Sequence, residues 1–224
     1  MHVVGVDIGG TFTDFVLYDP ESGSVHVHKV RSTPDEPERA TAAGLTQLCE
    51  RGGLEASDVD TVFHGTTIAT NAVLEHDGAV AGLVTTSGFR DVVHIGRHQR
   101  PQHYSVMQDI PWQARPFVKR RHRKVVAERI VPPAGAVLEQ LDEEGVRRVA
   151  RELREEGVEA VAVCFLFSYL NPEHERLAAS IIAEEIPGAF VTASADIFPQ
   201  FREFERFTTA CMNAFVGPKT GRYL

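Results

Sequence analysis

The sequence predicts an α/β fold, with a largely parallel or mixed sheet and helices on its faces. Two observations carry this prediction. Apolar runs of strand length alternate along the chain with segments whose apolar residues recur at helical spacing. In addition, residues 158–167 are nearly unbroken apolar sequence, which is typical of a strand that is covered on both faces.

The first half of the chain begins with strands. Three strand-like stretches are expected at 3–7, 14–18 and 25–30. Pro34 and Pro37 then introduce a helix of about 14 residues, which Gly52 and Gly53 stop. The elements expected next are a buried strand at 59–64, a helix at 66–75 that ends near Gly78, and a strand at 80–85. Residues 87–123 form the least regular section.

The second half has clearer signals. A strand-like stretch at 125–131 precedes Asp142, which is a good N-cap for a helix that Gly157 stops. The apolar residues of that helix recur at i, i+3, i+4 and i+7: Val146, Val149, Ala150 and Leu153. The elements expected after it are the 158–167 strand, a helix capped by Asn171 and Pro172 and ended by Pro187 and Gly188, and a strand at 190–193. One apolar stripe marks a terminal helix, with Phe204, Phe207, Cys211 and Phe215.

The composition is that of an ordinary globular chain. With 224 residues, of which 43% are apolar and 24% charged, it can bury a good core in one or two domains. The net charge of −8 argues against nucleic acid as a principal partner. No apolar stretch approaches the length of a membrane span, and the three cysteines form no metal or redox pattern. We therefore expect a cytoplasmic protein that contacts neither nucleic acid nor membrane.

The stretch from Val3 to Tyr18 carries the strongest functional signal. Two apolar runs flank a turn that holds a carboxylate, two glycines and two threonines. Glycines beside a strand let backbone N–H groups approach a phosphate, because no Cβ blocks the way. A carboxylate at the end of the first run can hold hydrated Mg²⁺ against the phosphates. The candidate nucleotide site consists of Asp7, Gly9, Gly10, Thr11, Thr13 and Asp14. The alternative is a plain β-hairpin in which Gly-Gly only makes the turn.

A second candidate site lies where a predicted strand enters a helix, at His64-Gly-Thr-Thr. Its amides and hydroxyls suit an anion, and Thr66 and Thr67 are candidate catalytic residues. Plain helix capping by Thr66 is an equal alternative. His64 as a general base is the weaker hypothesis.

Three further groups in the irregular section have competing interpretations. Arg97 and Arg100 are candidate substrate-binding residues, since guanidinium groups suit carboxylate or phosphate, although a solvated loop explains them too. His94, His98 and His103 lack the neighbouring carboxylate or cysteine that a zinc site needs, so we prefer exposed or substrate-facing histidines. The basic run at 119–124 is interpreted as a solvated approach to an edge strand rather than a nucleic-acid site.

The hairpin is similar to the first phosphate-binding hairpin of the ATPase superfamily that includes actin, the sugar kinases and the heat-shock chaperones. Five further segments, taken with it, resemble the N-terminal region of the hydantoinase A family. They are His64–Ala72, Thr86–Asp91, Ile95–Pro101, Ser168–Glu175 and Glu203–Arg206. That family includes the A-type subunit of N-methylhydantoinase, the corresponding half of 5-oxoprolinase, and subunits of acetone and acetophenone carboxylases.

The resemblance implies both the fold and the chemistry. It implies a ribonuclease H-like mixed sheet, one lobe of a two-lobed actin-like ATPase, with an additional α/β segment. It further implies that ATP with Mg²⁺ phosphorylates a carbonyl oxygen of a small cyclic amide or ketone. The product is then hydrolysed or carboxylated, often with a B-type partner subunit. We expect cyclic-amide hydrolysis. The alternatives are a ketone carboxylase subunit, a sugar or acetate-type kinase lobe, or a catalytically incomplete scaffold.

The length departs from the family pattern, because A-type chains are several times longer than this one. We therefore expect residues 1–200 to form the N-terminal region, an ATPase lobe with an inserted α/β segment. Residues 201–224 are expected to begin the family's central domain, here truncated. Superfamily members bind ATP between two lobes, and no second Asp-x-Gly-Gly-Thr pattern follows Asp14. The chain alone is thus expected to be inactive and to need the remaining lobe or domains.

Overall fold

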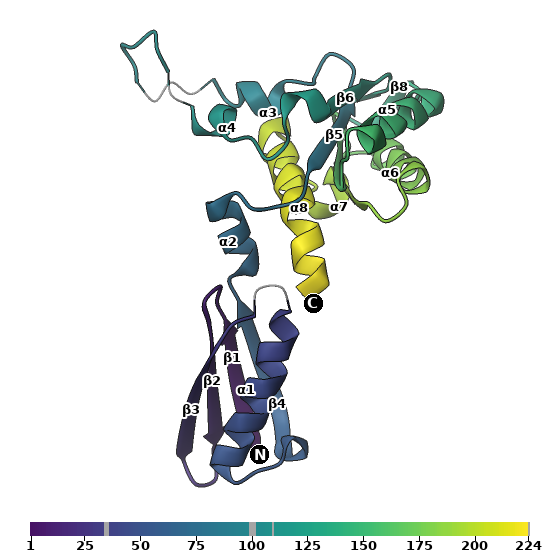
Figure 1. The fold of residues 1–224 in the computed structure, drawn as a ribbon. Helices are drawn as coiled ribbons and strands as arrows, with labels where there is room; N and C mark the ends of the chain where they lie inside the picture. Colours follow the sequence, from purple (N-terminus) through teal and green to yellow (C-terminus); the bar gives the residue numbers. More distant parts are fainter. Residues whose placement is uncertain (34–35, 99–101, 109, 224) are drawn as a thin grey trace. The chain divides into compact units, whose positions relative to one another are not determined.

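The structure is a computed structural model that describes residues 1–33, 36–98, 102–108 and 110–223. The chain divides into two units, which we describe separately (Figure 1). Unit 1 comprises residues 1–77 and the chain end from Lys219, and unit 2 comprises Gly78–Pro218. No helix in the described part of the chain combines the length and the apolar character that a membrane span requires.

Unit 1 is built on a four-stranded sheet with the order β3-β2-β1-β4. Its elements are β1 (His2–Ile8), β2 (Phe12–Asp19), β3 (Ser24–Arg31), α1 (Pro37–Gly52), a short 3₁₀ helix (Ala56–Asp58), β4 (Val59–Thr66) and α2 (Ile68–Glu75). The first three strands form an antiparallel meander, and β4 pairs parallel with β1. The three N-terminal strands and α1 occur where the sequence predicts them, and Gly53 ends α1 in a left-handed conformation.

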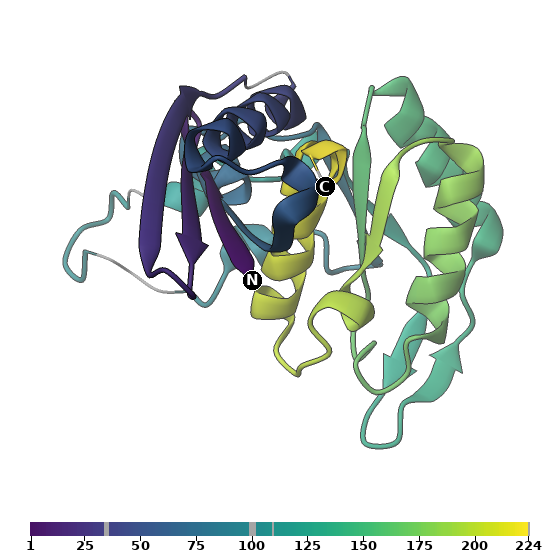
Figure 2. The ribbon, with the colours of Figure 1, turned by 90° about the horizontal axis from the view of Figure 1, so that it is seen from below.

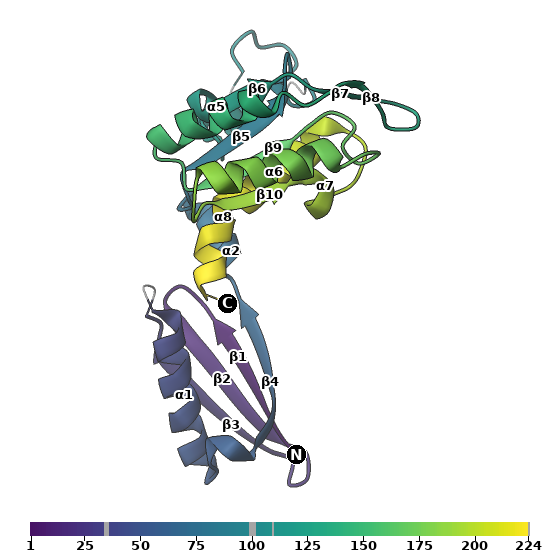
Figure 3. The same cartoon turned by 90° about the vertical axis from the view of Figure 1, so that its right-hand side faces the viewer.

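Helix α1 covers one face of this sheet (Figure 3). Side chains alternate along a strand, so every second residue of β1 and β2 faces the helix. The core between them consists of Val4, Val6, Ile8, Phe15, Leu17 and Leu48. The contact is close, because a Cβ on Gly44 of α1 would lie 2.4 Å from the Phe15 ring. The opposite face retains exposed apolar side chains, at Val16, Tyr18, Val25 and Val27.

Two predictions for unit 1 are wrong in detail. The strand at 59–64 was expected to be buried, whereas β4 lies at the edge of the sheet and exposes Val62 by 51% and Phe63 by 66%. An apolar run does not by itself distinguish a central strand from an edge strand. Helix α2 ends at Glu75, as predicted, but the residue that stops it is His76, whose φ of 59° is left-handed, and not Gly78.

Unit 2 is built on a four-stranded parallel sheet with the order β10-β9-β5-β6, beside a separate antiparallel pair of β7 and β8. Its strands are β5 (Ala81–Thr86), β6 (Arg123–Val126), β7 (Arg129–Val131), β8 (Ala136–Glu139), β9 (Ala160–Cys164) and β10 (Phe190–Ala193). Its helices are α3 (Val92–Ile95), α4 (Pro111–Ala114), a 3₁₀ turn (Arg120–His122), α5 (Glu143–Glu155), α6 (Glu173–Glu185), α7 (Ser194–Ile197) and α8 (Glu203–Tyr223).

Helices cover both faces of the parallel sheet. Figure 2 shows α5 and α6 in green on one face and α8 in yellow on the other. The predicted cap of α5 is confirmed, since the Asp142 carboxylate accepts a hydrogen bond from the Gly145 N–H at 2.9 Å. The predicted stripe of α8 is also confirmed at three buried positions: Phe207, Cys211 and Phe215. The three cysteines are free and buried.

The strand boundaries in unit 2 correct two expectations. Strand β9 covers only Ala160–Cys164 of the predicted 158–167, because the Phe165 N–H donates to the buried Glu175 carboxylate and Phe167 has a left-handed φ of 55°. The stretch at 125–131 is divided between β6 and β7.

The basic run at 119–124 leads into the edge strand β6, as predicted, but it is not fully solvated. The Arg123 side chain is only 1% exposed. Lys124 lies 3.2 Å from the Glu152 carboxylate and 2.7 Å from that of Glu156. The run is therefore largely bound within unit 2.

The contact between α1 and the sheet yields a stability prediction. Gly44→Ala places a methyl group inside van der Waals distance of the Phe15 ring, so we expect a loss of about 1–3 kcal/mol in the free energy of unfolding. Gly5→Ala is the matched control, because no atom lies within 4 Å of a Cβ at that position. Urea unfolding followed by far-UV circular dichroism measures both variants. Equal stabilities would contradict the close packing of α1 on β2.

Candidate functional site

The loop between β1 and β2 has unused hydrogen-bond donors. The Gly9 N–H donates to the Phe12 carbonyl at 3.0 Å, and the Thr11 carbonyl accepts from the Ser32 N–H at 3.0 Å. Within the described ranges, neither the Gly10 N–H nor the Thr11 N–H donates to another group, and both residues are exposed. Two adjacent amides without an acceptor, on exposed residues, suit an anion.

Thr13 braces this loop from inside. It is fully buried, and its hydroxyl lies 3.0 Å from that of Ser32. The Ser32 hydroxyl in turn donates to the Gly9 carbonyl at 2.7 Å. Thr13 therefore holds the loop through Ser32, a residue that the sequence analysis did not single out. The phosphate-binding role of Thr13 stays a prediction, and this placement does not add to it.

Two carboxylates lie on the sheet face opposite α1. Asp7 and Asp14 are direct cross-strand partners in the β1–β2 pair, an arrangement in which like charges repel. Asp14 is neutralised by the Lys29 ammonium at 2.8 Å. Asp7 is exposed at the end of β1 and makes no ion pair in the described part of the chain. The Asp7 carboxylate is therefore accessible to a cation, and its role in holding Mg²⁺ stays a prediction.

The second predicted segment meets the first at the carboxyl ends of β1 and β4. The Ile8 carbonyl accepts from both the Thr66 hydroxyl and the Thr67 N–H, each at 3.3 Å. The Thr66 hydroxyl also accepts from the Ile68 N–H at 3.2 Å, but the N-cap of α2 is Thr67, which makes no side-chain cap hydrogen bond, so the expected capping by Thr66 is not observed. Both threonines are exposed. The structure thus brings Thr66 and Thr67 beside the β1–β2 loop, while their catalytic role stays a prediction.

Asn71 is a member of this site that sequence reasoning missed. A Cβ on Gly10 would lie 3.3 Å from the Asn71 amide nitrogen, so loop and helix are in contact. That amide donates to the Thr67 hydroxyl at 3.3 Å, and the Asn71 N–H donates to the Thr67 carbonyl at 2.8 Å. The sequence contained part of this information, because residues four apart on a helix are neighbours and Asn71 follows Thr67 by four.

His64 is placed away from Asp7. Its register partner on β1 is Val6, which faces α1, whereas Asp7 faces the other side of the sheet. The weaker hypothesis of a general base at His64 therefore gains no support from the geometry around Asp7.

The other sequence candidates belong to unit 2. Arg97 makes a hydrogen-bonded ion pair with Glu205, and this bond lowers the pKa of the Glu205 carboxyl. Arg100 lies outside the described residues. Helix α3 ends at Ile95, so His94 and His98 do not share a helical face.

Comparison with known proteins places these motifs in context. Residues 3–186 match the family described as "Hydantoinase/oxoprolinase N-terminal region". Over 99% of its length, the chain is 34% identical to the caprolactamase subunit alpha of Pseudomonas jessenii. Over 95%, it is 33% identical to the acetophenone carboxylase gamma subunit of Aromatoleum aromaticum. The chain spans 32% and 31% of these two relatives, about a third of their length.

Two solved structures share the fold. The ATP-dependent caprolactamase from Pseudomonas jessenii matches with a TM-score of 0.83, covering 99% of this chain and 32% of that one. Nucleotide-free acetone carboxylase matches with a TM-score of 0.84 at 27% identity, covering 98% of this chain and 32% of that one. The mixed α/β fold with flanking helices is therefore common to all three.

The brace at Thr13 yields a prediction. Thr13→Val keeps the shape but removes the hydroxyl, so we expect a loss of about 1 kcal/mol in the free energy of unfolding. Thr13→Ser, which retains the hydroxyl, should recover most of this loss. Urea unfolding in the absence of nucleotide is the measurement. A Thr13→Val chain as stable as the unaltered one would reject the bracing role.

Proposed function

The chain belongs to the family of the hydantoinase/oxoprolinase N-terminal region, and from this we propose that it is the N-terminal part of an ATP-dependent cyclic-amide hydrolase. The caprolactamase subunit alpha, at 34% identity over nearly the whole chain, supports hydrolysis of a lactam. The complete enzyme would phosphorylate the carbonyl oxygen of the amide and then admit water. An unstrained amide resists water, and its O-phosphorylated form is a far better electrophile.

The single observation that carries the proposal is the pair of amides at Gly10 and Thr11, which find no acceptor among the described residues and lie next to Asp7 and the start of α2. Backbone N–H groups and the positive end of a helix both favour phosphate. Gly9 and Gly10 keep the loop free of side chains. The exposed Thr11 hydroxyl is a further donor.

Asp7 is proposed to hold Mg²⁺ through water. The donor set fits this mode, because the described residues contain no group of three or more His, Cys, Asp or Glu side chains placed to hold a metal ion. Mg²⁺ usually keeps several waters and binds through one or two carboxylates together with substrate phosphates. Asp14, already paired with Lys29, would keep the neighbouring charge balanced. When bound, Mg²⁺ would offset the phosphate charge during transfer.

We further propose that unit 1 is a ribonuclease H-like lobe of a two-lobed, actin-like ATPase. The antiparallel meander followed by a helix and by β4, parallel to β1, supports this assignment. Adenosine and the far side of the phosphates would then be bound by the remaining part of the A-type protein. The other proposed partner is a B-type subunit. The proposed compartment is the cytoplasm.

A ketone carboxylase is the second candidate function. The acetophenone carboxylase gamma subunit is 33% identical to this chain, close to the value for caprolactamase. Phosphorylation of a carbonyl oxygen serves both reactions, and they diverge in whether water or a carboxyl donor attacks next. Arg97 and Arg100 remain proposed substrate-binding residues, although Arg97 is paired with Glu205.

The proposed reaction is tested in the complete enzyme with a lactam whose carbonyl oxygen is ¹⁸O. The oxygen leaves with phosphorus when the O-phosphorylated amide is hydrolysed, so we expect the label in inorganic phosphate and lactam-dependent ADP formation without bicarbonate. Mass spectrometry of the phosphate is the measurement. Unlabelled phosphate would reject carbonyl phosphorylation, and a strict requirement for bicarbonate would favour the carboxylase.

The role of Asp7 is tested by Asp7→Asn in the same complete enzyme. Loss of the charge that holds Mg²⁺ should lower ATP hydrolysis about 100-fold or more, on the scale of losing a major electrostatic contribution. Because Asp7 is exposed, thermal unfolding should change little. Asp60→Asn, another exposed carboxylate of the same sheet, is the control and should retain full activity. Normal turnover by Asp7→Asn would remove Asp7 from the site.

A further inference from the structure

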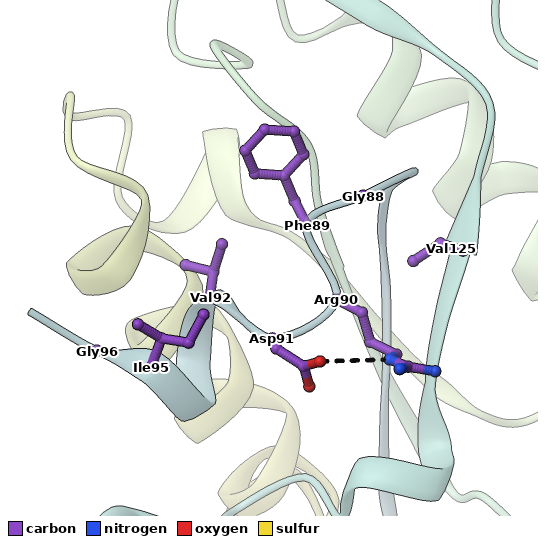
Figure 4. Close-up of a pocket in the computed structure, with 8 residues that line it drawn as sticks. All are labelled: Gly88, Phe89, Arg90, Asp91, Val92, Ile95, Gly96 and Val125. Carbon is purple, nitrogen blue, oxygen red and sulfur yellow. Dashed lines mark ion pairs between the residues drawn. The ribbon is translucent and has the colours of Figure 1, made fainter. Parts of the chain in front are cut away.

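Unit 2 has a pocket of its own, with a volume of about 590 Å³, which is within the range of small-molecule sites. It lies beyond the carboxyl end of β5, where ligands commonly bind in open parallel sheets. Its lining residues are Gly88, Phe89, Arg90, Asp91, Val92, Ile95, Gly96 and Val125 (Figure 4). All of its lining residues belong to unit 2, whereas the nucleotide site proposed above is built from unit 1.

The backbone around the pocket is firmly held. Gly88 has a left-handed φ of 87°, and the Phe89 N–H donates back to the Thr86 carbonyl at 3.0 Å. The Ser87 N–H donates to the Val126 carbonyl at 2.9 Å, which fixes the loop to β6. On the far side, Gly96 packs against Trp112, whose ring atoms would lie 3.1 Å from a Cβ there. These hydrogen bonds and this packing fix the shape of the pocket.

The lining residues Arg90 and Asp91 belong to a cluster of charged side chains in which positive charge is in excess. The Asp91 carboxylate accepts two hydrogen bonds from Arg120, at 3.0 and 2.9 Å, which lower the pKa of this carboxyl. Arg90 lies 3.7 Å from the same carboxylate, and Arg123 lies 3.9 Å from it. Three guanidinium groups thus lie near one carboxylate. Asp91 balances one of their positive charges and leaves two unbalanced.

Two of these arginines have unused donors. The Arg123 Nη1 is buried and has no hydrogen-bond partner among the described residues. Arg90 is 46% exposed, and its 3.7 Å separation from Asp91 exceeds hydrogen-bond distance. Figure 4 shows the Arg90 guanidinium facing the Asp91 carboxylate beside the strand of Val125. Since Arg90 makes no hydrogen bond to a group in the described part of the chain, its donors are available to a second anion.

The other walls are apolar, formed by Phe89, Val92, Ile95 and Val125. The Arg129 guanidinium lies 5.1 Å from the centre of the Phe89 ring and adds a further positive charge behind this wall. An arginine fork matches a planar carboxylate, and the apolar walls match a compact aliphatic body. We propose that this pocket binds a small organic carboxylate with an aliphatic ring or branch, held by Arg90.

The test uses a pair of probes of the same shape, cyclopentanecarboxylate and its uncharged amide, titrated into the ¹⁵N-labelled chain. The amide signals of Gly88 and Gly96 report occupancy, because both residues line the pocket. We expect the carboxylate to shift these signals and to bind about tenfold more tightly than the amide, since charge-assisted hydrogen bonds are roughly twice as strong as neutral ones.

The variant Arg90→Gln should weaken carboxylate binding by about tenfold, for the same reason. Arg148→Gln is the control, because that side chain is 65% exposed on α5 and outside the pocket. Val125→Asp should also weaken binding, because it adds a negative charge to the lining of the pocket. Equal binding of the two probes, unchanged binding by Arg90→Gln, or tighter binding of inorganic phosphate than of the carboxylate would each overturn the proposal.

Discussion

The parallel pairing of β1 with β4 is the constraint on which the candidate nucleotide site depends. Its register sets Asp7 opposite Gly65 and Ile8 opposite Thr66, so both strands end at the same edge of the sheet. The Ile8 carbonyl then accepts from the Thr66 hydroxyl and the Thr67 N–H. A shift of this register by one residue would turn the side chains of β4 to the other face of the sheet and would move Thr66 and Thr67 away from the Ile8 carbonyl.

The sequence predicted the parts of the fold whose signals are local. The cap at Asp142, the stop at Gly53 and the apolar stripe of α8 depend on residues within a few turns of each other, and all three are observed. The edge position of β4 could not be predicted in this way. It depends on which strands are neighbours in the sheet. Val62 and Phe63 are apolar, as residues of a central strand would be, so their identity does not predict the strand order.

In the candidate site, too, local features were predicted and features that depend on distant residues were missed. The turn composition was enough to select Asp7, Gly10 and Thr11, which the structure exposes around one loop. The bracing position of Thr13 depends on Ser32, which belongs to the segment after β3, and no spacing rule links the two. The arginine cluster around Asp91 was missed for a related reason. Arg120 and Arg123 follow Asp91 by about thirty positions and meet it only because β6 lies beside β5.

The contact between Gly10 and Asn71 has an evolutionary consequence. A Cβ at position 10 would lie 3.3 Å from the Asn71 amide nitrogen, so this amide, which is bonded to Thr67, would have to shift slightly. A substitution at either position therefore changes the fitness of substitutions at the other. In diverging lineages, a larger residue at position 10 would be accepted more readily after a smaller one had arisen at position 71. The order of these changes, and not only their identity, would decide which loop sequences natural selection can reach.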